Sequence, residues 1–73
     1  MEKLLEIINI VRENKNLDKL LIIDGNQNLM NDLGFDSLDL AELTVRCEKE
    51  FGVDIFADGI ITTVAEILEQ ING

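Results

Sequence analysis

Apolar residues recur with the period of an α-helix in three stretches of this chain. The first stripe lies in residues 2–13, the second in residues 37–51, and the third begins at Val64 and runs to the end of the chain. Because residues three and four apart share one face of a helix, each stretch predicts an amphipathic helix that packs its stripe against the others. The pattern therefore predicts an all-α fold. The inward-facing residues are expected to be Leu4, Ile7, Ile8, Val11, Leu40, Leu43, Cys47, Phe51, Val64, Ile67, Leu68 and Ile71.

Capping residues stand where two of these helices are expected to begin. Asp36 precedes the second stripe and Asp39 follows three residues later, which makes an acidic variant of the reciprocal capping box. Thr63 and Glu66 form the standard capping box before the third stripe. Gly73 is expected to end the last helix.

Two segments connect the predicted helices. Residues 14–35 are long for a loop in so small a domain, but apolar clusters in residues 17–23 and 29–33 can tie the loop to the core at several points. Asp24-Gly25-Asn26 predicts a turn within this loop. Residues 53–59 form the second connector, in which Ile55 and Phe56 are expected to fill the core.

Length and charge limit what this chain can do. Its 73 residues predict one domain, residues 1–73, with a single small core. Fifteen acidic against six basic residues give a formal charge of −9, which disfavours nucleic acid and anionic membranes and favours partners with basic patches. The one cysteine cannot form an internal disulfide, and neither a secretion signal nor a membrane-spanning run is expected. We therefore expect a monomer in the cytoplasm, or in an organelle matrix after removal of a transit peptide.

Residues 24–28 have oxygen-bearing side chains at alternating positions, as a calcium-binding loop does. Such a loop also needs glycine at its sixth position and glutamate at its twelfth, where this chain has Leu29 and Phe35. We therefore expect a polar turn and no metal site here.

Ser37 is the only serine of the chain and stands between the long loop and the second predicted helix. Because Asp36 serves as the N-cap, the Ser37 hydroxyl is left on the first turn facing solvent. A serine beside an aspartate is most often a residue that merely tolerates a helix start. With no histidine to activate it and no nucleophile elbow around it, Ser37 is not expected to be a catalytic nucleophile. The carboxyl groups of Asp36 and Asp39, on an exposed helix start, are expected to keep ordinary pKa values.

Residues 32–39 resemble the attachment motif of acyl carrier proteins, whose core is Leu-Gly-x-Asp-Ser-Leu and which reads here Leu33-Gly34-Phe35-Asp36-Ser37-Leu38. The similarity extends along nearly the whole chain. It implies a small four-helix bundle with three main helices, a short third helix in the connector and a long first loop. The connector between Ile55 and Ile61 is shorter than in fatty acid carriers and lacks their usual proline, which favours a reduced third helix.

The same resemblance implies that Ser37 carries a covalent 4'-phosphopantetheine arm, transferred from coenzyme A by a phosphopantetheinyl transferase. The thiol of that arm holds acyl groups as thioesters and presents them to enzymes of fatty acid, polyketide or related lipid and surface-polymer biosynthesis. The chain itself is then a carrier and not an enzyme. The acyl cargo and the pathway stay open. The alternative is an unmodified acidic helical adaptor that binds a basic protein partner.

The second predicted helix has another apolar stripe, formed by Leu38, Ala41 and Val45 and rotated away from the inward one. This stripe either packs inside as well or forms an exposed patch ringed by carboxylates. The resemblance favours the patch, because the matching positions of acyl carrier proteins meet acyl-loading and acyl-processing enzymes with basic docking surfaces. It implies that the partner-binding residues are Asp36, Leu38, Asp39, Ala41, Glu42, Val45 and Glu48.

Overall fold

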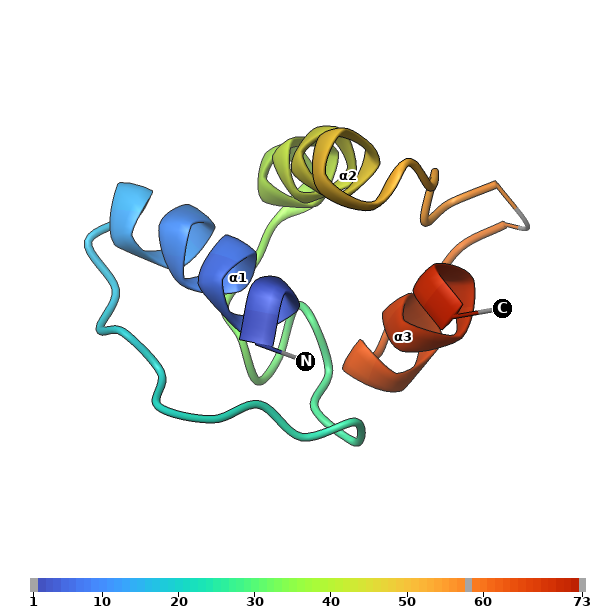
Figure 1. The fold of residues 1–73 in the computed structure, drawn as a ribbon. Helices are drawn as coiled ribbons and strands as arrows, with labels where there is room; N and C mark the ends of the chain where they lie inside the picture. Colours follow the sequence, from blue (N-terminus) through green and yellow to red (C-terminus); the bar gives the residue numbers. More distant parts are fainter. Residues whose placement is uncertain (1, 58, 73) are drawn as a thin grey trace.

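The computed structural model describes residues 2–57 and 59–72, with helices α1 (Glu2–Asn14), α2 (Ser37–Phe51) and α3 (Val64–Asn72) in that order. Figure 1 shows the long blue-green loop between α1 and α2 and the short connector before α3. The predicted all-α class is confirmed, since the described residues add only one isolated β-bridge, between Asn28 and Thr63, to the helices. Gly73, expected to end α3, lies outside the described residues.

The core is built from aliphatic side chains of all three helices and of both connecting segments. Burial of each large aliphatic side chain contributes about 1.5–3 kcal/mol to folding, which makes this cluster a main source of the stability of the fold. The buried apolar residues are Leu4, Ile7, Ile8, Val11, Leu29, Leu33, Phe35, Leu43, Cys47, Ile55, Ile61, Val64 and Ile67. Leu40, Phe51, Leu68 and Ile71, also expected to face inward, are partly buried against this cluster.

Helices α1 and α2 run antiparallel, as ion pairs at their two ends show. Lys3 near the start of α1 lies 3.5 Å from Glu50 near the end of α2. Lys15, just beyond the end of α1, lies 2.6 Å from Asp39 in the first turn of α2. The C-terminal end of α1 therefore lies beside the N-terminal end of α2, where Ser37 stands.

Polar side chains of α1 hold the long loop against the helix. The buried side chain of Asn9 donates to the Leu20 carbonyl at 2.9 Å and accepts from the Leu20 amide at 2.8 Å. Arg12 donates to the carbonyls of Asp18 and Leu33 at 3.1 and 2.6 Å. Because these contacts satisfy backbone groups that lie outside any helix, the loop is ordered without secondary structure of its own.

The expectation that apolar clusters tie the loop to the core is right for some residues and wrong for others. Leu29 and Leu33 are fully buried, and Leu20 and Ile23 pack partly against the core. Leu21 and Ile22, however, are 87% and 76% exposed. Asn9 fixes this part of the loop through its backbone, so the two side chains that follow Leu20 are not needed for anchoring and face solvent.

The loop also pairs with the start of α3. The Leu29 amide donates to the Thr62 carbonyl at 2.8 Å, and the Val64 and Ala65 amides donate to loop carbonyls at 3.1 and 3.0 Å. Gly25 lies so close to α3 that an added Cβ would approach the Ala65 Cβ to 3.3 Å, which explains the glycine in the predicted turn. This turn is confirmed by the bond from the Gln27 amide to the Asp24 carbonyl.

The short third helix implied by the resemblance does not form in the described part of the connector. Instead, the Ala57 amide bonds to the Asp54 carbonyl and the Gly59 amide to the Phe56 carbonyl, each at 3.1 Å, as in successive turns. The expected reduction of this element therefore leaves turns only, because the connector is too short to continue the hydrogen bonds into a helix. Ile55 is fully buried and Phe56 partly buried, as expected, whereas Asp58 lies outside the described residues.

The contact between Asn9 and Leu20 predicts a stability effect. Asn9→Ala leaves the amide and carbonyl of Leu20 without partners, and we expect the free energy of unfolding to fall by about 1–3 kcal/mol. Urea unfolding measures this loss, and hydrogen exchange of the Leu20 amide is expected to accelerate. Asn26→Ala, at an exposed turn position, is the matched control. Equal stability of the two variants would contradict the prediction.

Candidate functional site

The start of α2 is fixed by the capping box that the sequence predicts. Asp36 has an extended backbone and accepts a hydrogen bond from the Asp39 amide at 2.9 Å. In return, the Asp39 carboxylate accepts from the Asp36 amide at 2.9 Å. This reciprocal pair satisfies two donors at the loop-to-helix junction and determines where the helix begins.

Ser37 is the first residue of α2 and is exposed to solvent. Because Asp36 and Asp39 make the capping contacts, its hydroxyl takes part in no hydrogen bond among the residues that the structure describes. The backbone amides of Ser37 and Leu38, at the open end of the helix, are likewise not bonded to any described residue. The start of α2 therefore exposes an unengaged hydroxyl beside two amide donors that no described residue binds.

Lys15 joins α1 to this junction, and sequence reasoning did not find it. Its Nζ lies 2.6 Å from the Asp39 carboxylate, 2.9 Å from the Gly34 carbonyl and 3.9 Å from the Asp36 carboxylate. Gly34 has a φ of 78°, a left-handed conformation that favours glycine, and it turns the loop toward the helix start. The ammonium group thus holds the turn and the cap together and offsets part of their negative charge.

The pKa values of this pair reflect the contact. Burial alone raises the pKa of Asp39, but the hydrogen bonds from Lys15 and from the Asp36 amide outweigh it, so the pKa lies below its ordinary 3.8. The hydrogen bond to Asp39 raises the pKa of Lys15 above its ordinary 10.5. The expectation of an ordinary pKa was therefore wrong for Asp39, because its partner comes from a distant part of the chain.

The second apolar stripe of α2 is exposed. Leu38 and Val45 are 79% and 66% exposed, and Ala41 between them is also exposed, whereas Leu43 and Cys47 on the opposite stripe are fully buried. The alternative that both stripes pack inside is thus excluded.

The predicted partner-binding carboxylates border this exposed stripe but differ in how exposed they are and in which contacts they make. Asp36 and Glu48 are exposed. Glu42 is half-buried and accepts hydrogen bonds from Arg46 at 2.8 Å and Asn14 at 3.2 Å. The side chain of Asp39 is only 13% exposed. Asp36 and Glu48 are therefore the carboxylates of the set most open to a partner.

Cys47 and the polar turn at residues 24–28 contribute to the structure and show no arrangement suited to catalysis or metal binding among the described residues. Cys47 is fully buried, and burial raises the pKa of its thiol to about 11, which keeps it protonated and unreactive at neutral pH. In the predicted polar turn, the side chains of Asp24 and Asn28 accept hydrogen bonds from backbone amides of the same loop. Across residues 2–57 and 59–72, no group of acidic, cysteine or histidine side chains is arranged to hold a metal ion.

None of the helices in the described residues is both long enough and apolar enough to cross a membrane.

Comparison with known proteins shows the family of this helical chain. The family described as "Phosphopantetheine attachment site" matches residues 5–71, and the chain belongs to this family. The proteins of this class are carriers, not enzymes, and their cofactor is phosphopantetheine.

Relatives place the chain more narrowly among the acyl carrier proteins. The acyl carrier protein of Lactobacillus acidophilus is 38% identical over 68 residues, which cover 90% of this chain and 84% of that protein. The acyl carrier proteins of Rickettsia canadensis and Rickettsia prowazekii are also 38% identical over 68 residues, covering 90% of this chain and 78% of each relative. No solved structure matches the chain. The general function is therefore that of an acyl carrier.

The contact between Lys15 and Asp39 predicts how stability varies with pH. Because the pKa of Asp39 is lowered in the folded state, its contribution is present above its ordinary pKa of 3.8 and is lost as pH falls through the lowered value. Because the pKa of Lys15 is raised, its contribution is present below its ordinary 10.5 and is lost as pH rises through the raised value.

Asp39→Asn tests this dependence. We expect it to lower the free energy of unfolding by roughly 1 kcal/mol at neutral pH, and the difference from the original chain to shrink in acid below the ordinary pKa of Asp39. Urea unfolding across a pH series measures both. Glu48→Gln, on an exposed carboxylate of the same helix, is the control. A difference that persists unchanged in acid would show that charge at Asp39 does not contribute.

Proposed function

We propose that Ser37 is the residue that carries the 4'-phosphopantetheine arm, and that the chain presents acyl groups on this arm to partner enzymes. The observation that carries the proposal is the exposed Ser37 hydroxyl, which is free of hydrogen bonds to the described residues. It lies within the Leu33–Leu38 segment that matches the attachment motif. When bound, the arm supplies a terminal thiol that holds the acyl group as a thioester.

The residues around Ser37 fit a phosphodiester at this position. The free amides of Ser37 and Leu38 and the dipole of α2 favour a negative charge by about 0.3–1 kcal/mol. The Asp36 and Asp39 carboxylates oppose it, and Lys15 offsets part of that repulsion. Since these contributions are comparable, the chain tolerates the phosphodiester at the helix start without clamping it. We therefore expect the arm to stay mobile, as visits to several enzymes require.

We further propose that the exposed stripe of α2 and its carboxylates form the partner-binding face: Asp36, Leu38, Asp39, Ala41, Glu42, Val45 and Glu48. Leu38 and Val45 give it an apolar centre, and Asp36 and Glu48 give it exposed negative charge. Asp39 and Glu42 act partly through the contacts that hold α1 to α2. Such a face fits enzymes with basic patches, and its affinity is expected to be modest and sensitive to salt.

The partners that follow from this proposal are a phosphopantetheinyl transferase and enzymes that load or process acyl groups. The chain acts as a monomer in the cytoplasm, where its single cysteine, Cys47, stays reduced. The pathway is fatty acid, polyketide or related lipid and surface-polymer synthesis.

Modification in vitro tests the role of Ser37. The chain incubated with coenzyme A and a phosphopantetheinyl transferase is expected to gain the mass of one arm, whereas Ser37→Ala gains none. Thr62→Ala removes another exposed hydroxyl and is expected to be modified like the original chain. If Ser37→Ala is still modified, or if the folded chain is not, the assignment of Ser37 is wrong.

Charge reversal on α2 tests the partner-binding face. Glu48→Lys is expected to raise the KM of the transferase for this chain by about tenfold at low salt with little change in kcat, because the lost attraction acts on encounter. Glu69→Lys makes the same charge change at an exposed position on α3 and is expected to have a much smaller effect. An equal effect of both variants would indicate a response to net charge rather than to this face.

A further inference from the structure

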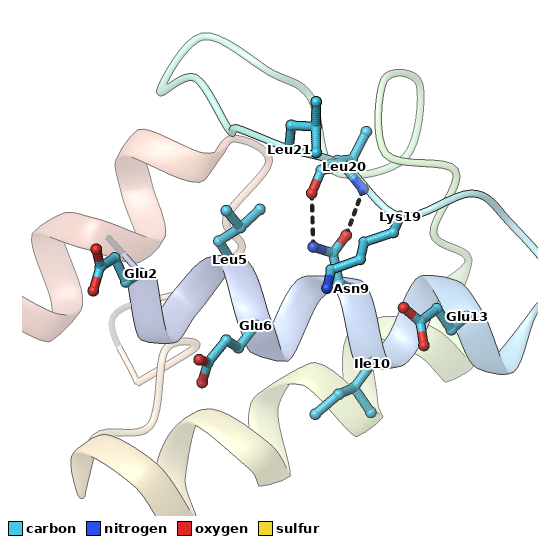
Figure 2. Close-up of a pocket in the computed structure, with 9 residues that line it drawn as sticks. All are labelled: Glu2, Leu5, Glu6, Asn9, Ile10, Glu13, Lys19, Leu20 and Leu21. Atoms are coloured by element: carbon cyan, nitrogen blue, oxygen red, sulfur yellow. Dashed lines mark hydrogen bonds between the residues drawn. The ribbon is translucent and has the colours of Figure 1, made fainter.

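A groove lies along α1, between this helix and the loop. It has a volume of about 560 Å³ and is lined by side chains of α1 and of loop residues 19–21. Figure 2 shows Leu20 and Leu21 on the loop above α1, Leu5 and Asn9 between loop and helix, and Glu6 and Ile10 along the lower edge of the helix in this view, so the lining spans α1 from the loop to that edge. No residue of α2 lines it, so the groove is separate from the Ser37 junction and from the partner-binding face.

The apolar wall of the groove is held in place by polar contacts. Both hydrogen bonds of Asn9 go to the backbone of Leu20, as the dashed lines in Figure 2 mark. Leu21 follows directly and is 87% exposed although its backbone is fixed beside α1. Ile10 on the helix side is also an exposed large hydrophobic residue. The backbone of Leu21 is held in place, but its apolar side chain stays in water. A bound partner would bury this side chain and gain the free energy of removing it from water.

The charge along the groove is negative. Glu2, Glu6 and Glu13 are spaced four and seven residues apart, so they follow one side of α1 over about 16 Å. Lys19 is the single basic residue of the lining. Lys3 lies outside the lining, 3.8 Å from Glu6 and 3.5 Å from Glu50. The groove is thus an apolar strip bordered by carboxylates.

We propose that this groove is a second docking site, which takes a basic amphipathic helix of a partner protein. About three helical turns fit its length, and lysines or arginines spaced four and seven residues apart on such a helix would face Glu2, Glu6 and Glu13. Apolar residues of the same helix would pack on Leu5, Ile10 and Leu21. A second copy of this chain is the wrong partner, since its own charge is −9 and its exposed α2 stripe is also ringed by carboxylates.

A titration with a defined probe tests the proposal. The probe is a synthetic amphipathic peptide of about four helical turns with a leucine stripe flanked by lysines. NMR of the labelled full chain is expected to show amide shifts in α1 and in residues 19–21, and binding that weakens with salt. Leu21→Ser is expected to weaken the affinity read at these amides about tenfold. Met30→Ser, at an exposed residue of the same loop outside the groove, is expected to leave it unchanged.

Other outcomes would overturn the proposal. These are shifts confined to α2, equal binding of a peptide with glutamates in place of the lysines, or equal affinity of the Leu21→Ser and Met30→Ser variants. A dimer in sedimentation that Leu21→Ser abolishes would assign the groove to a second copy instead. Groove shifts caused by an octanoyl group loaded on the chain's own arm would assign it to the acyl cargo. Ser37→Ala is expected to bind the peptide like the original chain, so this test is independent of the attachment site.

Discussion

The position of Ser37 depends on the reciprocal cap at the start of α2 and on its contact with Lys15. Together these contacts join the end of α1, the long loop and the start of α2. Asp36 and Asp39 alone would concentrate two carboxylates at one helix end. The Lys15 ammonium group, 2.6 Å from Asp39 and 2.9 Å from the Gly34 carbonyl, binds one carboxylate and the preceding turn together. Since the contact also connects the end of α1 to the start of α2, the orientation of the two helices and the exposure of Ser37 are determined at the same place.

The first helix has a second role beyond its apolar stripe. Asn9, Arg12 and Lys15 recur every three residues, and each binds the backbone of the segment that leads to Ser37: Leu20, then Asp18 and Leu33, then Gly34. The bonds from the charged groups of Arg12 and Lys15 are stronger than bonds between neutral groups. A small domain with one thin core thus orders a long loop through polar side chains, which leaves apolar loop residues such as Leu21 free for other contacts.

Local features of the sequence were sufficient to predict the helices, the capping boxes and the two stripes of α2, because period and capping depend on residues a few positions apart. The exposure of Ser37 followed from the same reasoning, since Asp36 was assigned as the cap. The contacts of Lys15 and Asn9 could not be predicted in this way, because each joins residues eleven or more positions apart with no pattern between them. The exposure of Leu21 and Ile22 could not be predicted for the same reason. A cluster of apolar residues in the sequence does not show that the buried side chain of Asn9 already anchors the backbone beside them.

Negative charge limits how the exposed apolar surfaces can be used. Leu38 and Val45 on α2 and Leu21 beside α1 are the kind of surface that leads to self-association in a small protein. Here each lies among carboxylates, so two copies that bring these surfaces together also bring like charges together, at a cost that salt reduces but does not remove. A basic partner is instead attracted by the carboxylates that border either surface. Because the two surfaces share no residue, a partner in the groove beside α1 makes its contacts without the residues that flank Ser37.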